Sequence, residues 1–563
     1  MKRTDFSVDW LFAACAPDTE LLPWNAQFTP VDLPHDWQIR HADDLYRDGT
    51  LFYRKYFFVT DVPGTRRMLW FGGAYMDTTV FVNGTEVGQW KYGYTSFWFD
   101  ITDALHEGQN EVLVRCNLRH PNSRWYSGAG LYRNVELWEA PDLHLMPDGL
   151  YVAAKEGDNG AWTVAVTAEA GSVTAASAGR TLTLHLTDDN GSLLGTAAIP
   201  ADAWAALPSP DGWRTGKETA IYKASHTFTL QDPALWDLDA PSFYHITAEL
   251  TGADGVTDTL TTRFGCRTIE ATPDCGLLVN HKRVLIKGVC IHHDFGCLGS
   301  AFEYSAAKRQ LEILKSMGVN SIRTGHTPPA PQFMDLADEM GILMDVESFD
   351  CWRSGKNPYD YGRFFDEWQE KDVAAWIRRD RNHPSLLFWC IGNEIYDTHA
   401  GSEGADTMRM LLAEVAAHDP ARNGIPTLGS NYMPWENTQH CADIIKVAGY
   451  NYGERLYASH HEKHPDWVIY GSETSSIVQS RGIYHFPLSQ SLLSDDDLQC
   501  SSLGNSRTSW GAESWDICLQ SEQRWPFTLG QYLWTGWDYI GEPTPYHTRS
   551  SYFGTIDTAG FPK

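Results

Sequence analysis

The second half of the chain alternates short apolar stretches with helical patterns, and this alternation limits its fold more than any other feature. Eight apolar stretches occur, at Val284–Val289, Ser321–Thr324, Ile342–Asp345, Leu386–Ile391, Thr427–Gly429, Ile445–Ala448, Val468–Tyr470 and Gln531–Trp534. Helical patterns lie between several of them, at Ser305–Met317, Pro331–Met340, Phe365–Arg379 and Asp406–Ala417. Strands that alternate with helices form parallel sheets. Eight such strands predict a closed (β/α)8 TIM barrel over residues 275–563.

The first half of the chain has a different texture, in which polar and apolar residues alternate over short runs. In residues 1–140 the runs are Leu51–Val59, Met68–Phe71, Thr79–Val82, Ser96–Phe99 and Glu111–Cys116. In residues 141–274 they are Trp162–Thr167, Thr181–Leu186, Ala224–Leu230 and Tyr244–Leu250. Short alternating runs separated by turns are typical of β-sandwiches. We therefore predict two sandwiches before the barrel, the second of immunoglobulin-like type.

Charge and hydrophobic patterning exclude several classes of partner. The chain has 44 Lys and Arg against 72 Asp and Glu, a net charge of −28, so binding to nucleic acid or an anionic membrane is not expected. No apolar run approaches the roughly 18 residues of a membrane span. The N-terminal apolar stretch carries Asp5 and Asp9, unlike a secretory signal. We expect a cytoplasmic protein whose 11 scattered cysteines are reduced thiols.

Two glutamates follow predicted barrel strands at the end where the strands finish. Glu394 comes soon after Leu386–Ile391, and Glu473 after Val468–Tyr470. Active sites of such barrels are built at the carboxyl ends of the strands. The two glutamates are 79 residues apart, which leaves room for other strands between them, so we expect them on different sides of one barrel mouth. The alternative is that each is a helix cap or a structural, ion-paired carboxylate.

Two facing carboxyl groups are what cleavage of a glycosidic bond requires. One must carry a proton for the leaving oxygen, and the other must be ionised to attack or stabilise an oxocarbenium-like carbon. Burial and mutual repulsion hold the pKa values of such a pair apart. The 23 Trp, 25 Tyr and 24 Phe also suit sugar binding, because the apolar face of a sugar ring stacks on an aromatic ring.

At these and other positions the chain resembles glycoside hydrolase family 2, the β-galactosidase/β-glucuronidase family. The first family signature resembles residues 320–328 with Gly341–Asp345, and the second resembles residues 380–394. Residues 123–133, which read Ser-Arg-Trp-Tyr-Ser-Gly-Ala-Gly-Leu-Tyr-Arg, are similar to the motif that closes the family's N-terminal domain. The resemblance covers essentially the whole chain. It implies a jelly-roll sugar-binding-like domain at 1–140, an immunoglobulin-like domain at 141–274 and the barrel at 275–563.

The resemblance also implies roles for individual residues. Glu394 matches the family's acid/base, Glu473 its nucleophile, and Asn393 the residue that hydrogen-bonds the sugar 2-OH. The family is retaining, which implies carboxyl groups roughly 5 Å apart. Independently, we expect Arg323 to pair with the carboxylates and to help keep Glu473 ionised.

Further substrate-binding candidates lie at the ends of other strands. His326 matches a sugar-binding histidine, and a structural histidine is the alternative. One of His292 and His293 is expected to meet sugar hydroxyls. A tyrosine after the sixth strand is expected to hold the nucleophile, with Tyr452 favoured over Tyr450. The remaining candidates are Asp350, Trp352 and Trp534; for Trp537 a core role is as well supported as a functional one.

The sequence favours a β-galactoside as the substrate. Family members that cleave glucuronides carry an Asn-x-Lys motif after the eighth strand, and residues 551–561 contain none. Residues 534–545 look like the galactosidase branch instead. The alternatives are a β-glucuronidase or β-galacturonidase that takes its cation elsewhere, for example from Arg549, and a non-catalytic carbohydrate-binding protein.

Other properties follow only as expectations. A metal-dependent hydrolase would need clusters of ligands, and His292-His293-Asp294 is the sole hint of one. No cofactor is expected to be required, although some relatives use a Na or Mg ion. Subunit contacts often shape the active site in this family, which implies a homo-oligomer. The sequence ends where an eighth helix should begin, so we expect it to be part of a longer chain.

Overall fold

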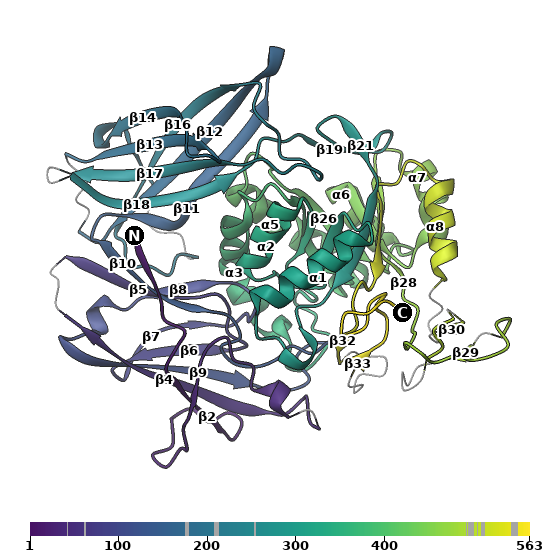
Figure 1. The fold of residues 1–563 in the computed structure, drawn as a ribbon, viewed down its shortest axis with the longest axis horizontal. Coiled ribbons are helices and arrows are strands. Elements are labelled where there is room, and N and C mark those ends of the chain that lie inside the picture. The colour runs from purple at the N-terminus through teal and green to yellow at the C-terminus, as the bar shows by residue number, and fades with distance from the viewer. Residues whose placement is uncertain are drawn as a thin grey trace.

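The computed structural model describes most of the 563 residues. The described ranges are 1–41, 43–60, 64–174, 179–207, 213–252, 255–490, 492–493, 500–503, 505–507, 513–541 and 550–563. Within them the chain forms two β-sandwiches and a barrel (Figure 1).

The barrel is closed by eight parallel strands in chain order. They are β22 (Ile286–Ile291), β23 (Ser321–Thr324), β24 (Leu343–Glu347), β25 (Leu386–Asn393), β26 (Ile425–Ser430), β27 (Val447–Asn451), β28 (Val468–Ser475) and β31 (Gly530–Trp534). All eight coincide with the predicted apolar stretches to within a few residues. Every residue of β25 is buried, as expected for a parallel strand covered on both faces.

Helices surround the barrel wall. They are α1 (Tyr304–Ser316), α2 (Pro331–Met340), α3 (Phe365–Asp380), α4 (Asp397–Ala400), α5 (Glu403–His418), α6 (Glu436–Ile445), α7 (Tyr457–Lys463) and α8 (Trp515–Arg524). Helix α2 illustrates why the prediction worked: it begins with a proline and ends at Gly341, which has a φ of 62°, and both residues are common helix boundaries. Among the described residues no helix is long and apolar enough to cross a membrane.

The first sandwich consists of two sheets, ordered β1-β10-β5-β8 and β3-β2-β4-β9-β6-β7. Its strands are β1 (Lys2–Asp5), β2 (Trp10–Cys15), β3 (Thr29–Val31), β4 (Gly49–Val59), β5 (Thr65–Phe71), β6 (Thr78–Val82), β7 (Thr85–Trp90), β8 (Phe97–Asp100), β9 (Gly108–Leu118) and β10 (Val135–Pro141). Strand β9 alternates buried and half-buried residues, the pattern of a sheet with one face in the core.

The second sandwich also has two sheets, ordered β11-β12-β16-β15 and β14-β13-β17-β18. Its strands are β11 (His144–Glu156), β12 (Ala161–Ser172), β13 (Thr181–Asp188), β14 (Leu193–Pro200), β15 (Ala205–Ala206), β16 (Ala220–Gln231), β17 (Tyr244–Gly252) and β18 (Gly255–Phe264). A small sheet of β19 (Ile269–Thr272), β20 (Gly276–Val279) and β21 (Lys282–Val284) leads into the barrel.

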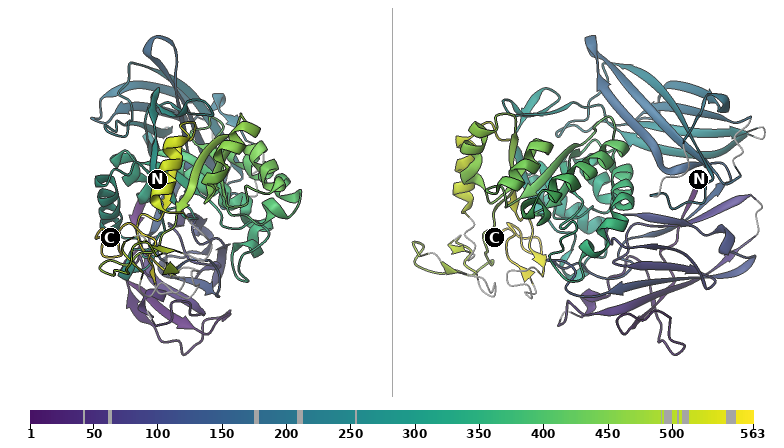
Figure 2. Two further views of the ribbon diagram at one scale, coloured as in Figure 1. Left: turned by 90° about the vertical axis from the view of Figure 1, so that its right-hand side faces the viewer. Right: turned by 180° about the vertical axis from the view of Figure 1, so that it is seen from behind.

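Both sandwiches lie against the same side of the barrel, as Figure 1 and the view from behind in Figure 2 show. Hydrogen bonds join each sandwich to the barrel. Arg133 Nη2 of the first sandwich donates to the carbonyl of Pro328 at 3.0 Å, and the backbone N–H of Val152 in the second donates to Asn382 Oδ1 at 3.0 Å. The predicted fold class is therefore confirmed.

Candidate active site

The two strand-end glutamates occupy the carboxyl ends of different barrel strands. Glu394 directly follows β25 and Glu473 lies near the end of β28. Their residues are 8% and 4% exposed. Glu394 has a φ of 47°, a left-handed conformation that costs energy for a residue other than glycine and that tends to occur at functional sites.

Glu473 is held by two donors, one on each carboxyl oxygen. Arg323 Nη1 donates to Oε1 at 2.8 Å, and the Tyr452 hydroxyl donates to Oε2 at 2.8 Å. Burial raises the pKa of Glu473, while the charge of Arg323 and both hydrogen bonds oppose that rise. Arg323 therefore pairs with Glu473 as expected, and Tyr452 is the tyrosine that holds it.

Glu394 also has one donor on each oxygen, but from different elements. Arg124 Nη1 donates to Oε2 at 3.1 Å, and Asn451 Nδ2 donates to Oε1 at 3.1 Å. Asn451 ends β27, whereas Arg124 belongs to the first sandwich. The two glutamates thus differ in their environment, because Glu473 faces a fully buried guanidinium and Glu394 faces one that is partly open to solvent.

Asn393 and Asp350 connect these two environments. Asn393 Oδ1 accepts from Arg323 Nη2 at 2.9 Å, and its Nδ2 donates to Asp350 at 3.0 Å. Asp350 also accepts from Arg124 and from Lys356 Nζ, each at 2.7 Å. Burial works to raise the pKa of Asp350, but these two cations outweigh it and hold the pKa below its ordinary value. Asp350 is therefore an ionised hub beside Glu394.

His326 and Trp534 form an aromatic wall next to Glu473. Their rings are stacked, with centroids 5.2 Å apart and planes 3° from parallel. His326 Nδ1 lies 2.6 Å from Glu347 Oε2, and its Nε2 lies 3.8 Å from Glu473 Oε1. Burial, followed by the charge of Arg323, holds the pKa of His326 well below its ordinary value. The ring is therefore neutral near pH 7 and suited to hydrogen bonds with hydroxyl groups.

The structure separates the paired histidines at the end of β22. His292 packs against Trp534, Tyr539 and Trp125, with ring centroids 4.3 to 5.4 Å apart. His293 turns toward the first sandwich, where its Nε2 lies 3.1 Å from the carbonyl of Ser127. His292 is thus the one that lies with the other candidate residues.

Two further predicted residues lie away from this cluster. The Tyr450 hydroxyl lies 2.8 Å from His460 Nδ1, in a small core next to α7. Trp352 is fully buried, and its Nε1 donates to the carbonyl of Ile391 at 2.9 Å. This bond to the barrel backbone and its place in the main hydrophobic core give Trp352 a packing role. Trp537 is likewise buried in the main core.

Besides Arg323 and the aromatic neighbours of His292, four residues with charged or amide side chains bond to the cluster and were not among the candidates. They are Arg124, Lys356, Asn451 and Glu347. Asn451 and Glu347 each end a barrel strand, so the strand-end rule that selected Glu394 could have found them. Arg124 and Lys356 lie in loops, where no periodicity marks them. Arg124 does fall within the quoted motif at residues 123–133, which was the available signal.

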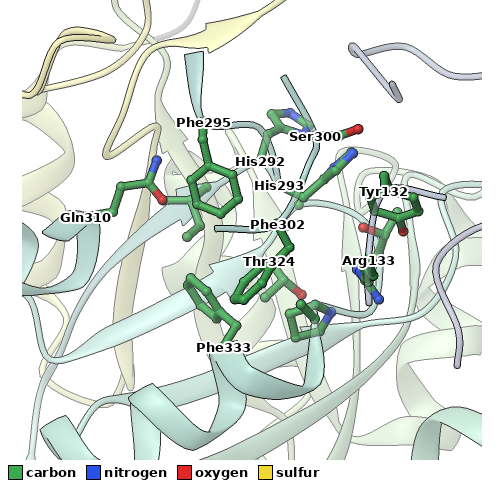
Figure 3. Close-up of a pocket in the computed structure, with 15 residues that line it drawn as sticks. Tyr132, Arg133, His292, His293, Phe295, Ser300, Phe302, Gln310, Thr324 and Phe333 are labelled. Atoms are coloured by element: carbon green, nitrogen blue, oxygen red, sulfur yellow. The ribbon is translucent and has the colours of Figure 1, made fainter. Parts of the chain in front are cut away.

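A small cavity lies beside the candidate residues, between the first sandwich and the barrel (Figure 3). His292, His293, Phe302 and Phe333 are among the residues that line it, and neither glutamate does. Its volume is about 30 Å³, which is room for about one water molecule. This cavity is too small for a sugar ring and is not the substrate site.

Among the described residues, the cluster with metal-ligand spacing is Asp335, Asp338 and His383. Arg263 Nη2 already contacts both aspartates, at 3.3 and 3.4 Å. The charge of Asp338, against the effect of burial, raises the pKa of His383 to about 9. With Arg263 and a protonated His383 beside the two aspartates, this cluster forms an ion-paired network.

Comparisons with known proteins agree on one family. Residues 148–267 match the profile described as glycosyl hydrolases family 2, and residues 271–461 match glycosyl hydrolases family 2, TIM barrel domain. The chain is 34% identical to beta-galactosidase BoGH2A of Bacteroides ovatus, over 100% of this chain and 71% of that protein. It is 26% identical to a beta-glucuronidase of Bacteroides fragilis, over 92% of this chain and 75% of that protein.

A comparison with a solved structure supports the same family. The crystal structure of a glycosyl hydrolase family 2 member from Bacteroides cellulosilyticus superposes with a TM-score of 0.84 and 27% identity, over 100% of this chain and 70% of that chain. The chain spans 71% of the length of the Bacteroides ovatus protein and 75% of the Bacteroides fragilis protein. It spans 54% of the length of a third similar protein. Profile, sequence and structure all indicate that the chain belongs to glycosyl hydrolase family 2.

Proposed function

We propose that the chain is the catalytic part of a retaining, exo-acting glycoside hydrolase that cleaves terminal β-D-galactosides. The observation that carries this proposal is the contrast between the two strand-end glutamates. Glu473 accepts from a buried cation and a hydroxyl, which favour the ionised nucleophile, whereas Glu394 accepts from an amide and from a cation that is partly open to solvent, and is assigned as the acid/base. A non-catalytic carbohydrate-binding protein would not need this contrast.

The proposed reaction has two displacements at the anomeric carbon. First, Glu394 gives its proton to the glycosidic oxygen while Glu473 attacks the carbon, and the electron pair of the broken bond stays on the leaving oxygen. Then Glu394, now ionised, takes a proton from water, whose oxygen displaces Glu473. Two inversions retain the β configuration. His326, His292 and Trp534 are proposed to surround the sugar, and Asn393 to meet its 2-OH.

The choice of galactoside has two supports. The chain's similarity to a protein named beta-galactosidase extends over its whole length. Residues 551–561 also lack the Asn-x-Lys motif that the resemblance associates with glucuronides. A sugar without a carboxylate needs no such cation.

A β-uronide is the second candidate, and a specific observation favours it. Arg124 and Lys356 are two cations beside Glu394, and Asp350 is the carboxylate that both contact. Once Glu394 carries its proton, this group has a net positive charge and would attract a sugar carboxylate. Several similar proteins are named beta-glucuronidase or putative beta-glucuronidase. Arg549, the cation suggested by the sequence, lies outside the described residues.

A panel of nitrophenyl glycosides tests the proposal. We expect the full-length enzyme to hydrolyse the β-D-galactoside faster than the β-glucuronide, β-galacturonide, β-glucoside and β-mannoside. Proton NMR of the first product should show the β anomer. Faster cleavage of a uronide would keep the mechanism and replace the sugar assignment. No cleavage of any substrate by an intact protein would favour the binding-protein interpretation.

Tyr452→Phe tests how the nucleophile is kept ionised. The Tyr452 hydrogen bond lowers the pKa of Glu473, so its removal raises that pKa, and a higher pH is then needed to ionise the nucleophile. We expect the acid limb of kcat/KM to move up by about one pH unit. The loss of a hydrogen bond to a charged group, worth about 1.5–3 kcal/mol, should lower kcat about 10- to 100-fold.

Tyr450→Phe is the matched control, because its hydroxyl contacts His460 and not Glu473. The acid limb should stay in place in this variant. An equal shift in both variants would contradict the role given to Tyr452.

A further inference from the structure

A loop of the first sandwich forms one wall of the candidate active site. The loop joins β9 to β10 and carries the motif at residues 123–133. The ring of Trp125 lies 5.4 Å from that of His292 and 5.5 Å from that of His326. The loop is fixed from behind, because Trp125 Nε1 donates to the Tyr94 hydroxyl at 3.1 Å and the Tyr126 hydroxyl donates to Asp36 at 2.6 Å.

Arg124 reaches from this loop to two carboxylates of the barrel, Asp350 after β24 and Glu394 after β25. Its Nε and Nη2 donate to the two oxygens of Asp350 at 3.1 and 2.7 Å, and its Nη1 donates to Glu394 Oε2 at 3.1 Å. A planar guanidinium with two bonds to one carboxylate has a fixed direction. The direction of the Nη1 donors is then fixed as well, and Nη1 donates to Oε2 of Glu394.

Asp350, the carboxylate that accepts two hydrogen bonds from Arg124, is itself held by other residues. Asp350 is buried and also accepts from Lys356 at 2.7 Å and from Asn393 at 3.0 Å. The other oxygen of Glu394 accepts from Asn451 at 3.1 Å. The carboxyl group of Glu394 is thus oriented by two donors, one from the barrel and one from the sandwich.

We propose that Arg124, a residue of the first sandwich, is a positioning residue that orients Glu394 for both of its proton transfers. The inference rests on the proposed function and deepens it. Arg124 acts through Glu394, by holding Oε2 in the direction of the leaving oxygen and then of the attacking water. It follows that the sandwich is part of the catalytic unit.

If Arg124 orients Glu394, the loss of rate in an Arg124 variant should depend on the leaving group of the substrate. In the first step the proton of Glu394 moves to the glycosidic oxygen as the bond to carbon breaks. An aglycone that leaves readily as an anion, such as dinitrophenolate, needs no proton. Misorientation of Glu394 should therefore slow the first step only for poor leaving groups. Damage to the fold or to sugar binding would slow it for every substrate.

The experiment compares wild type with Arg124→Gln and Arg124→Lys on a methyl and a dinitrophenyl glycoside of the preferred sugar. For Arg124→Gln we expect kcat/KM to fall about 10²-fold with the methyl glycoside, the low end of general acid catalysis. With the dinitrophenyl glycoside it should stay within about threefold of wild type, because proton donation contributes little there. Arg124→Lys keeps the charge but loses the fork and should be intermediate.

The second step gives an independent readout. With the dinitrophenyl glycoside, kcat and KM of Arg124→Gln should fall together, because water is activated poorly and the glycosyl-enzyme accumulates. Azide needs no base, so its addition should restore kcat and yield a glycosyl azide. Failure of azide to raise kcat would contradict the proposal.

Arg119→Gln is the matched control. Arg119 lies in the same loop and is 25% exposed, against 26% for Arg124, but it contacts Asp18 and the hydroxyl of Tyr359 instead of the site. It should show no dependence on the leaving group. Equal losses with both substrates in Arg124→Gln would overturn the inference and leave the proposed function standing. If wild type cleaved neither glycoside, the proposed function itself would fail.

Discussion

Glu473→Gln should lower kcat by about 10⁴-fold or more, because removal of a nucleophile abolishes the covalent route. The amide has nearly the shape of the carboxylate and can still contact Arg323 and Tyr452, which now hold Oε1 and Oε2 at 2.8 Å. The fold should therefore persist, and the loss should appear in kcat with the preferred nitrophenyl glycoside. Circular dichroism would check that the variant is folded.

The control for this variant is Glu312→Gln on α1, whose side chain is exposed and pairs with Lys308. Its activity should equal that of wild type. A Glu473→Gln enzyme that kept more than about a hundredth of wild-type kcat would be incompatible with a nucleophilic Glu473.

Arg323→Met should have the second-largest effect, on stability as well as on activity. Arg323 is completely buried, contacts Glu473, Glu347 and Asn393, and has its Nε 3.9 Å from Asp345. Removal of one partner from a buried ionic group leaves the others uncompensated, at a cost of about 3–5 kcal/mol. We expect the unfolding transition of the barrel to move to lower denaturant by a corresponding amount, and catalysis to be lost at the same time.

The pH dependence of the lost stability in Arg323→Met shows whether uncompensated negative charge causes it. Burial raises the pKa of Asp345 from 3.8 to about 6, although Arg323 opposes the rise. Between these two pKa values the folded state binds more protons than the unfolded state. Asp345 therefore stabilises the fold below pH 3.8, and this stabilisation is lost as the pH rises through about 6. Without Arg323 the folded pKa rises further, so the destabilisation should be smaller at about pH 4 than at about pH 8.

A double variant separates charge from packing. Asp345→Asn removes a negative charge that Arg323 compensates, so Arg323→Met/Asp345→Asn should be destabilised by less than the sum of the single changes. Simple additivity at about pH 8 would mean that lost packing, and not the uncompensated charge, causes the effect.

The barrel could be predicted from the sequence because a parallel strand covered on both faces must be apolar throughout. Residues 386–391 are an uninterrupted apolar run, and residues 331–340 begin with proline and are followed by glycine. The ends of the predicted strands then identified the two glutamates as candidates, because the carboxyl ends of all barrel strands meet at one mouth. The same rule covers Glu347 and Asn451, which were overlooked since their roles are contacts with other side chains.

Residues outside the strand pattern could not be placed in this way. Arg124 and Glu394 are 270 positions apart and belong to different folding units, and no local pattern encodes how a sandwich docks on a barrel. Trp352 shows the opposite case, since it follows a strand end but turns into the core, where its Nε1 bonds to the carbonyl of Ile391. The direction of a loop side chain depends on packing that only the structure supplies.

Trapping of the glycosyl-enzyme tests the central claim most directly. A dinitrophenyl fluorosugar of the preferred glycone should inactivate the full-length enzyme, because fluorine slows both displacements whereas the activated leaving group speeds only the first, so that the glycosyl-enzyme accumulates. Mass spectrometry of the digested protein should then place one sugar on the peptide that contains Glu473, and none on that peptide in Glu473→Gln. Sugar attached to the Glu394 peptide, or turnover with inverted stereochemistry and no adduct, would contradict the assignment of Glu473 as the nucleophile of a retaining enzyme.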